Sequence, residues 1–216
     1  MLKKITFSLF ILLSCISSFA YYHFHLREHF GLTKEMQVQK WSMAKPDYST
    51  LHSCDLIFRH GRGAISNLLM SFSRREAKYS HVGIISVENE KVFVYHAIGG
   101  EENISNKLRK DELEVFCNPN DIYSFGIYRL DLNDAQQQEV DSIVKNYYTN
   151  RLEFDTRFDF ATNDKMYCSE FVYKVIMPVV RDNKYLSLST VSGVKFVVCD
   201  DLYLNIHSRF IYSYIY

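Results

Sequence analysis

The sequence predicts an α+β protein, and two kinds of pattern carry this prediction. Helical periodicity is clearest after Asn133, where apolar side chains recur on one face at Val140, Val144 and Tyr147. Short apolar runs over 81–87 and 92–97 are instead typical of buried strands. Because the predicted helices and strands alternate irregularly and the strands form a hairpin, we expect an antiparallel sheet packed against helices.

The expected elements follow one another in a single domain, since no repeat, low-complexity segment or Pro-rich linker interrupts the 216 residues. Pro46 ends the first helix. Asn133 and Gln136 have the spacing of a capping box, which predicts a helix start. The elements are a helix within 27–44, a strand over 54–59, a helix over 64–72, strands over 81–87 and 92–97 joined by a turn, a strand over 122–130, a helix over 133–148, a helix from Cys168, and strands over 194–198 and 210–215.

The amino terminus resembles a secretory signal peptide. Lys3 and Lys4 precede an apolar stretch, and Ala20 follows small residues at the spacing that a signal peptidase recognises. Two alternatives stay open, namely a lipid anchor on Cys15 and an uncleaved membrane anchor, although the stretch is short for a full span. We therefore divide the chain into a signal peptide (1–20), a helical lead-in (21–50) and a main domain (51–216). We expect a secreted or periplasmic protein if the signal peptide is cleaved, and a membrane-associated one if the N-terminus is an anchor.

The charge and the cysteine content indicate which partners and which covalent cross-links the protein can have. Removal of residues 1–20 would change the formal net charge from 0 to −2, so the strongly basic surface that nucleic-acid binding requires is not expected. A secreted chain can form disulfides. If Cys168 stays reduced, the three cysteines at 54, 117 and 199 can form at most one bridge, and the sequence does not decide whether they do.

Cys168 is the candidate nucleophile. It begins an apolar helix pattern, and a thiol at a helix N-terminus has unpaired backbone N–H groups beside it that favour a thiolate. His81 begins the strand over 81–87, and His96 ends its antiparallel neighbour, so the two side chains can lie side by side. We predict that Cys168 is the nucleophile, His81 its base and His96 the residue that orients His81.

The same three side chains could in principle bind zinc. No CxxC or HExxH spacing supports a metal site. We expect neither a metal nor an organic cofactor.

Five segments carry a resemblance to a known family: residues 55–59 (DLIFR), 79–84 (YSHVGI), 94–97 (VYHA), 159–160 (DF) and 167–173 (YCSEFVY). They resemble the circularly permuted NlpC/P60 cysteine hydrolases of the YiiX/YebB type, a permuted papain-fold group related to lecithin:retinol acyltransferase proteins. The resemblance spans residues 52–178 and implies a circularly permuted papain-like fold. It also implies the roles given above for Cys168, His81 and His96. An acidic residue is frequent in the group at the position of His96, whereas the acyltransferase relatives have histidine there.

The expected reaction is acyl transfer. Cys168 attacks a carbonyl, His81 moves the proton, and water resolves a thioester intermediate. The substrate is a peptide, lipid or other acyl compound joined by an amide, ester or thioester bond. A cell-wall peptide is the first candidate and a lipid or N-acyl amide the second, while a non-catalytic binding module of the same fold is the alternative. The substrate and the oligomeric state are not written in the sequence.

Overall fold

The computed structural model describes residues 31–100, 103–191 and 193–216. By internal contacts the chain divides into two compact units, residues 1–39 and 40–216. The predicted signal peptide, the lipid-anchor alternative at Cys15 and residues 21–30 of the lead-in lie outside the described residues. In the described part of the chain, no helix has both the length and the apolar character needed to cross a membrane.

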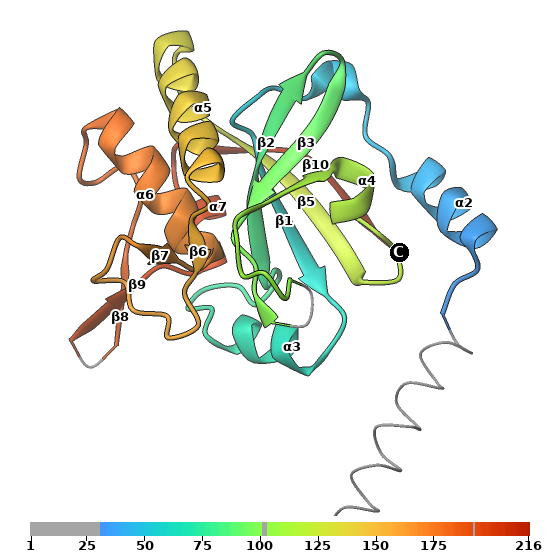
Figure 1. The fold of residues 1–216 in the computed structure, drawn as a ribbon, viewed down its shortest axis with the longest axis horizontal. Coiled ribbons are helices and arrows are strands. Elements are labelled where there is room, and N and C mark those ends of the chain that lie inside the picture. Colours follow the sequence, from blue (N-terminus) through green and yellow to red (C-terminus); the bar gives the residue numbers. More distant parts are fainter. Residues whose placement is uncertain (1–30, 101–102, 192) are drawn as a thin grey trace, which may run out of the picture. The chain divides into compact units, whose positions relative to one another are not determined.

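A six-stranded sheet organises the second unit (Figure 1). Its strands lie in the order β10-β5-β1-β2-β3-β4, and each strand pairs antiparallel with its neighbours. The strands are β1 (Leu56–Gly61), β2 (His81–Glu88), β3 (Lys91–His96), β4 (Arg109–Glu112), β5 (Ile122–Leu130) and β10 (Ser208–Ile215). Two small two-stranded sheets lie outside it, made by β6 (Glu153–Phe154) with β7 (Lys165–Met166) and by β8 (Ser189–Val191) with β9 (Val194–Phe196).

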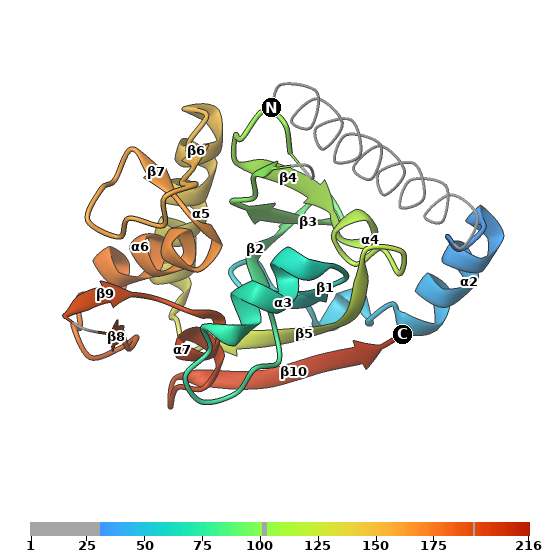
Figure 2. The same cartoon turned by 90° about the horizontal axis from the view of Figure 1, so that it is seen from below.

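Within the second unit, the helices that follow β1 in the chain lie around this sheet (Figure 2). In chain order, the helices of the described residues are α2 (Lys34–Ala44), the 3₁₀ turn η1 (Tyr48–Thr50), α3 (Ala64–Ser71), α4 (Leu113–Phe116), α5 (Asp134–Thr149), α6 (Cys168–Val180) and α7 (Cys199–Tyr203). The predicted capping box is present at the start of α5, where Asn133 Oδ1 accepts from the Gln136 backbone and the Gln136 side chain accepts from the Asn133 backbone. The α+β prediction is confirmed.

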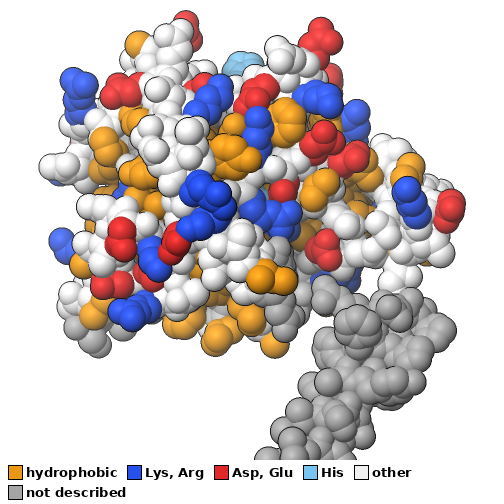
Figure 3. Space-filling view, in the orientation of Figure 1, with side chains coloured by type: hydrophobic (Ala, Val, Ile, Leu, Met, Phe, Trp, Pro, Cys, Tyr) orange, Lys and Arg blue, Asp and Glu red, His pale blue; other side chains and the backbone are white. Residues whose placement is uncertain are grey.

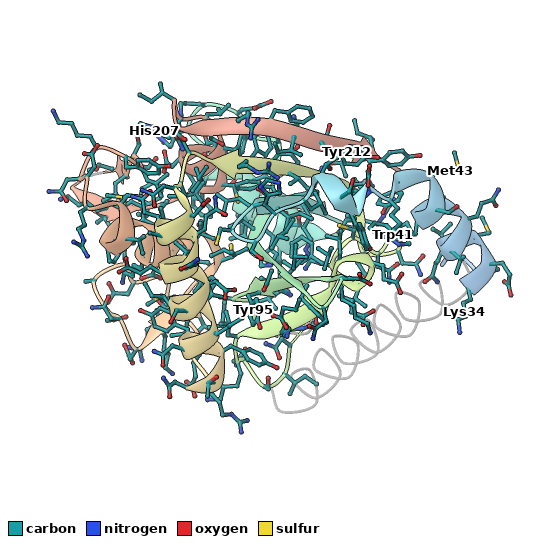
Figure 4. The ribbon with its side chains drawn as sticks, turned by 90° about the horizontal axis from the view of Figure 1, so that it is seen from above. Lys34, Trp41, Met43, Tyr95, His207 and Tyr212 are labelled. Atoms are coloured by element: carbon teal, nitrogen blue, oxygen red, sulfur yellow. The ribbon has the colours of Figure 1, made fainter. Side chains whose placement is uncertain are left out.

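Alternate residues of the strands supply two separate cores, as expected for a sheet that is covered on both faces. In β1, Leu56 and Phe58 join a cluster with apolar residues of α5, α6 and α7. Ile57 belongs to a second cluster with Phe116 of α4, against which Trp41 packs. Figure 4 shows Tyr95 of β3 on the α5 side, where its ring meets the Tyr148 ring edge-on at 5.3 Å. The sheet is thereby fixed from both sides, which holds the ends of β2 and β3 in place.

Candidate active site

Cys168 is the first residue of α6, and the local sequence explains why the helix starts there. Tyr167 has extended backbone angles, and its N–H donates to Glu170 Oε2 at 3.1 Å, so a side chain of the first turn satisfies the preceding amide. Lys174 Nζ lies 2.7 Å from the other Glu170 oxygen, one turn further along. The neighbouring Ser169 hydroxyl donates to the Val197 carbonyl at 2.8 Å, which anchors the helix start to a distant segment.

The thiol of Cys168 is buried, with 8% of the residue exposed. Burial raises its pKa, whereas backbone hydrogen bonds from Val82, Ser169 and its own amide lower it. The sequence led us to expect a lowered pKa at this helix start, and that expectation is wrong for the enclosed thiol. The backbone donors work as predicted, but burial outweighs them.

The Val82 amide can serve the thiol because of the register of the sheet. Pairing between β2 and β3 begins at Ile84 and Tyr95, so the first three residues of β2 pair only with β1. Val82 immediately follows His81. Cys168 therefore reaches β2 beside its proposed base, and α6 and β2 are packed against each other.

His81 and His96 are in direct contact. His81 Nε2 lies 2.8 Å from His96 Nδ1, and the rings meet edge-on with centroids 5.0 Å apart. The register places the two residues diagonally rather than directly opposite, which is still within reach of long side chains. Phe116 of α4 packs against both rings, at centroid distances of 5.7 Å and 5.0 Å. Each ring is thus held by a hydrogen bond and an aromatic neighbour.

Asp111 extends this pair, and the sequence reasoning missed it. His96 Nε2 lies 2.9 Å from Asp111 Oδ2, and Arg109 NH2 lies 2.7 Å from the same oxygen. Burial, the largest single influence, raises the pKa of Asp111, but the hydrogen bonds and charges of His96 and Arg109 together bring it below its usual range. Asp111 is therefore an ionised acceptor, the fixed negative charge that a histidine at position 96 does not supply.

An ionised Asp111 sets the direction of both hydrogen bonds in the series from Asp111 through His96 to His81. A carboxylate can only accept, so His96 must donate from Nε2 and keep a lone pair on Nδ1. That lone pair accepts the proton on Nε2 of His81. The remaining lone pair is on His81 Nδ1. Neutral His81 is consequently held in the tautomer that can act as a base through Nδ1.

Both imidazoles are neutral at ordinary pH. Burial lowers the pKa of His96 to about 4, with Asp111 acting in the opposite direction and Arg59 and Arg109 reinforcing the decrease. Burial also lowers the pKa of His81 well below its usual value, and Arg59, His96 and Arg109 add to the effect. The resting site is therefore a neutral thiol beside neutral histidines, not a preformed ion pair.

No hydrogen bond joins Cys168 Sγ to His81 among the described residues. The structure brings His81 and His96 together directly, whereas it brings Cys168 to the residue after His81. Cys168 belongs with Val82 to the core cluster of α6, whereas Phe116, which contacts both imidazole rings, belongs to the other cluster. The thiol and the two rings therefore approach the start of β2 from different faces of the sheet. The assignment of the three residues as a catalytic triad thus stays a prediction.

The other described cysteines are free and buried. Burial raises the pKa of Cys54 to about 12, and its thiol donates to the Gln137 carbonyl at 3.2 Å. Burial also raises the pKa of Cys117 and of Cys199. Cys168 differs from these three because several donors converge on its sulfur.

The donor set for a metal ion is poor. Among the described residues, no group of three or more His, Cys, Asp and Glu side chains is placed to hold one. Among these residues, both nitrogens of His96 are engaged and the Asp111 carboxylate is bound by His96 and Arg109, which leaves His81 Nδ1 and the Cys168 sulfur as ligands near the site. Zinc sites use at least three protein ligands, and these residues do not fit one.

A cysteine at a helix start, packed on a strand that carries a histidine, defines the class of papain-like cysteine hydrolases, here with the histidine strand preceding the cysteine helix. The chain belongs to the family of permuted papain-like amidase enzymes designated YaeF/YiiX, C92 family, whose model matches residues 50–195. The resemblance to the YiiX type and the permuted papain-like fold are confirmed.

Two relatives are similar to the chain. It is 25% identical over 123 residues to the uncharacterized protein YiiX of Escherichia coli strain K12, which covers 56% of this chain and 55% of that protein. The chain thus matches about half the length of this curated relative. A crystal structure described as that of metalloprotein yiiX from Escherichia coli O157:H7 superposes with a TM-score of 0.62 at 18% identity, over 77% of this chain and 99% of that one. At that identity the likeness shows the fold.

Proposed function

We propose that the chain is a cysteine amidase in which Cys168 is the nucleophile, His81 the general base and His96 the residue that orients it. Asp111 is added as a positioning residue that acts through His96. The family supports a cysteine hydrolase in general. The observation that carries the finer assignment is the chain of hydrogen bonds from Asp111 through His96 to His81, which ends beside the strand amide that contacts the Cys168 thiol.

The reaction begins with a neutral thiol. As the sulfur attacks the carbonyl carbon, His81 Nδ1 takes the thiol proton, and the positive charge on its ring is stabilised through His96 by Asp111. The backbone amides at the start of α6 and the Val82 amide are donors for developing negative charge. His81 then returns its proton to the leaving nitrogen, leaving a thioester on Cys168. Water, deprotonated by His81, hydrolyses the thioester and releases the acid.

The substrate is an acyl compound, and the bond can be an amide, an ester or a thioester. We rank a peptide amide first because the family is one of amidases, and a long-chain N-acyl amide second. The experiment is to incubate the protein with one substrate of each kind and identify the acid released by mass spectrometry. Cys168→Ser and His81→Gln are the paired variants, and Cys54→Ser is the matched control, since its thiol is equally enclosed but lies elsewhere.

The expected result is turnover by the wild type and Cys54→Ser, and none by Cys168→Ser. Turnover that survives Cys168→Ser would refute the nucleophile. If no acyl substrate is turned over or bound covalently while the protein is folded, the chain is a binding module of this fold. The relative described as a metalloprotein makes one further measurement necessary, namely metal content after purification without chelator. Stoichiometric metal lost in His81→Gln would replace the thiol mechanism with a metal site.

We also propose that the enzyme acts outside the cytoplasm. The support is the pattern of residues 1–20 alone, with its basic start, apolar stretch and small residues before Ala20. Mass spectrometry of the mature N-terminus tests this, because cleavage after Ala20, lipidation at Cys15 and an intact Met1 give three different masses.

A further inference from the structure

Helix α3 presents an apolar stripe to solvent. Ile65, Leu68 and Phe72 are 73%, 58% and 53% exposed, and no residue of the helix is buried. Their spacing of three and four places them on one face, because a helix repeats every 3.6 residues. Figure 3 shows hydrophobic side chains gathered along the lower edge of the molecule, where Figure 1 places α3. Isolated exposed apolar residues are ordinary, but a contiguous stripe indicates a binding surface.

The helix is held in this position by polar contacts at both ends. Before it, the Arg62 amide donates to the Asp121 carbonyl at 2.7 Å, and Arg62 Nε donates to the Ile122 carbonyl at 3.0 Å. After it, the fully buried Asp200 accepts from the backbone amides of Arg74 and Arg75 at 2.9 Å and 2.6 Å. These hydrogen bonds therefore hold α3 in the position in which its apolar stripe is exposed.

The charged residues of the segment 62–74, which contains the stripe, are both basic. Arg62 precedes α3 and Arg74 follows Phe72, both are exposed, and no acidic residue occurs between them in the sequence. The Arg75 guanidinium is engaged by the Asp200 and Leu204 carbonyls and lies 3.5 Å from Asp201. The Arg62 guanidinium lies over the Tyr123 ring at 4.1 Å and its Nε donates to the Ile122 carbonyl, so its terminal nitrogens and the Arg74 guanidinium are the basic groups offered to a ligand. An apolar helix face with basic residues at its ends is the composition of a segment that lies in the surface of an anionic membrane.

Size and charge favour a bilayer over a second copy of the chain. A helix of eight residues is about 12 Å long, so the stripe is far smaller than the ~800 Å² that each partner buries in a stable protein interface. Twofold pairing of α3 on α3 would also bring the arginines of both copies together. A fluid lipid surface has no such minimum area, because each side chain inserts independently.

We propose that α3 docks on the surface of an anionic lipid bilayer, inserting Ile65, Leu68 and Phe72 while Arg62 and Arg74 meet the phosphate groups. The contact also concerns the site, since Ser66 of α3 is hydrogen-bonded to Ser80, the residue before His81. Docking would place the candidate active site close to the lipid surface. The proposal does not depend on the catalytic roles given above.

The test uses the full chain carrying Phe72→Trp and vesicles of phosphatidylcholine with or without phosphatidylglycerol. The spectrum of wild type, which contains Trp41, is subtracted. Val194→Trp on β9 is the matched control, because Val194 is 67% exposed on a different segment. This readout reports on α3 itself, so binding through the N-terminal residues does not imitate it.

The expected result is a blue shift at position 72 with phosphatidylglycerol vesicles and none at position 194. Leu68→Ser should weaken the partitioning that this shift reports by about tenfold, the effect of removing one inserted side chain, and Val194→Ser should not weaken it. No shift at position 72, or equal shifts at 72 and 194, would overturn the proposal. An equal response to vesicles of phosphatidylcholine alone would overturn the anionic surface. A shift that follows protein concentration without lipid would assign the stripe to a second copy instead.

Discussion

Replacing Asp111 by Asn tests the proposed direction of the hydrogen-bond chain. The substitution keeps the size of the side chain but removes the charge that accepts from His96 Nε2 at 2.9 Å. An amide can donate as well as accept, so His96 and His81 are no longer held in one tautomer. A hydrogen bond to a charged group contributes about 1.5–3 kcal/mol. At 1.36 kcal/mol per factor of ten, the rate of reactions that use His81 as base should fall about 10- to 100-fold.

The assay needs no knowledge of the substrate. Chloroacetamide alkylation of Cys168 is followed by peptide mass spectrometry across a pH series, and the wild-type and Asp111→Asn rates are compared. Glu112→Gln is the matched control, because Glu112 is the neighbouring acidic residue on β4 and pairs at the surface with Lys91, at 3.7 Å. Asp111→Glu should restore part of the rate. A wild-type rate in folded Asp111→Asn at every pH would refute the role of Asp111.

Three further predictions concern the stability of the protein and the packing of the strands that carry the site. His96 has a pKa of about 4 in the folded protein and of about 6.5 in the unfolded chain. Because the unfolded state binds the proton more tightly, the free energy of unfolding should fall by about 3 kcal/mol as the pH decreases from 6.5 to 4. His96→Asn should flatten that part of the plot of Tm against pH. Asp55→Ala should lower the free energy of unfolding in urea by about 3–5 kcal/mol, because it leaves the largely buried Arg129 without its carboxylate partner. Asp141→Ala, which breaks the surface pair with Lys145, should lower it by less than about 1 kcal/mol. Equal losses in the two variants would contradict this prediction. Gly83→Ala should destabilise the protein and slow Cys168 alkylation, since its methyl group would overlap Val94 and meet the next strand's backbone at 3.0 Å, and Val94→Ala in the same chain should relieve part of the effect.

Local patterns in the sequence predicted most of the frame of the fold. The expected strand over 122–130 is β5, and the capping box of Asn133 starts α5. The hairpin that carries His81 and His96 forms as expected, because alternating burial and a polar turn are local signals. These elements fix where the candidate base and its neighbour lie.

Asp111 could not be found in the same way. It lies in Arg109–Glu112, four charged residues in succession, which has no apolar pattern to indicate a strand. This segment becomes β4 only because the edge of β3 offers backbone partners, with Asp111 opposite Val94. The one available signal was chemical, since His96 without a carboxylate leaves the orienting residue incomplete.

The pKa of Cys168 was mispredicted for a related reason. A helix start and nearby amides can be read from the sequence, and they do lower the pKa. The opposing effect is burial, which depends on how closely α6 packs on β2. Periodicity indicates that one face of α6 is buried, but it does not show how completely the first residue is enclosed.

The most direct test of the account is to trap the acyl-enzyme. The protein is mixed with p-nitrophenyl acetate, whose activated ester bond is broken as a thioester forms, and the acetylated residue is located by peptide mass spectrometry. We predict a burst of about one p-nitrophenolate per protein, as expected of a single acylated nucleophile, with the acetyl group on Cys168 and the burst lost in His81→Gln. Acetylation of Cys54, or an unmodified Cys168 until the protein is unfolded, would contradict the central claim.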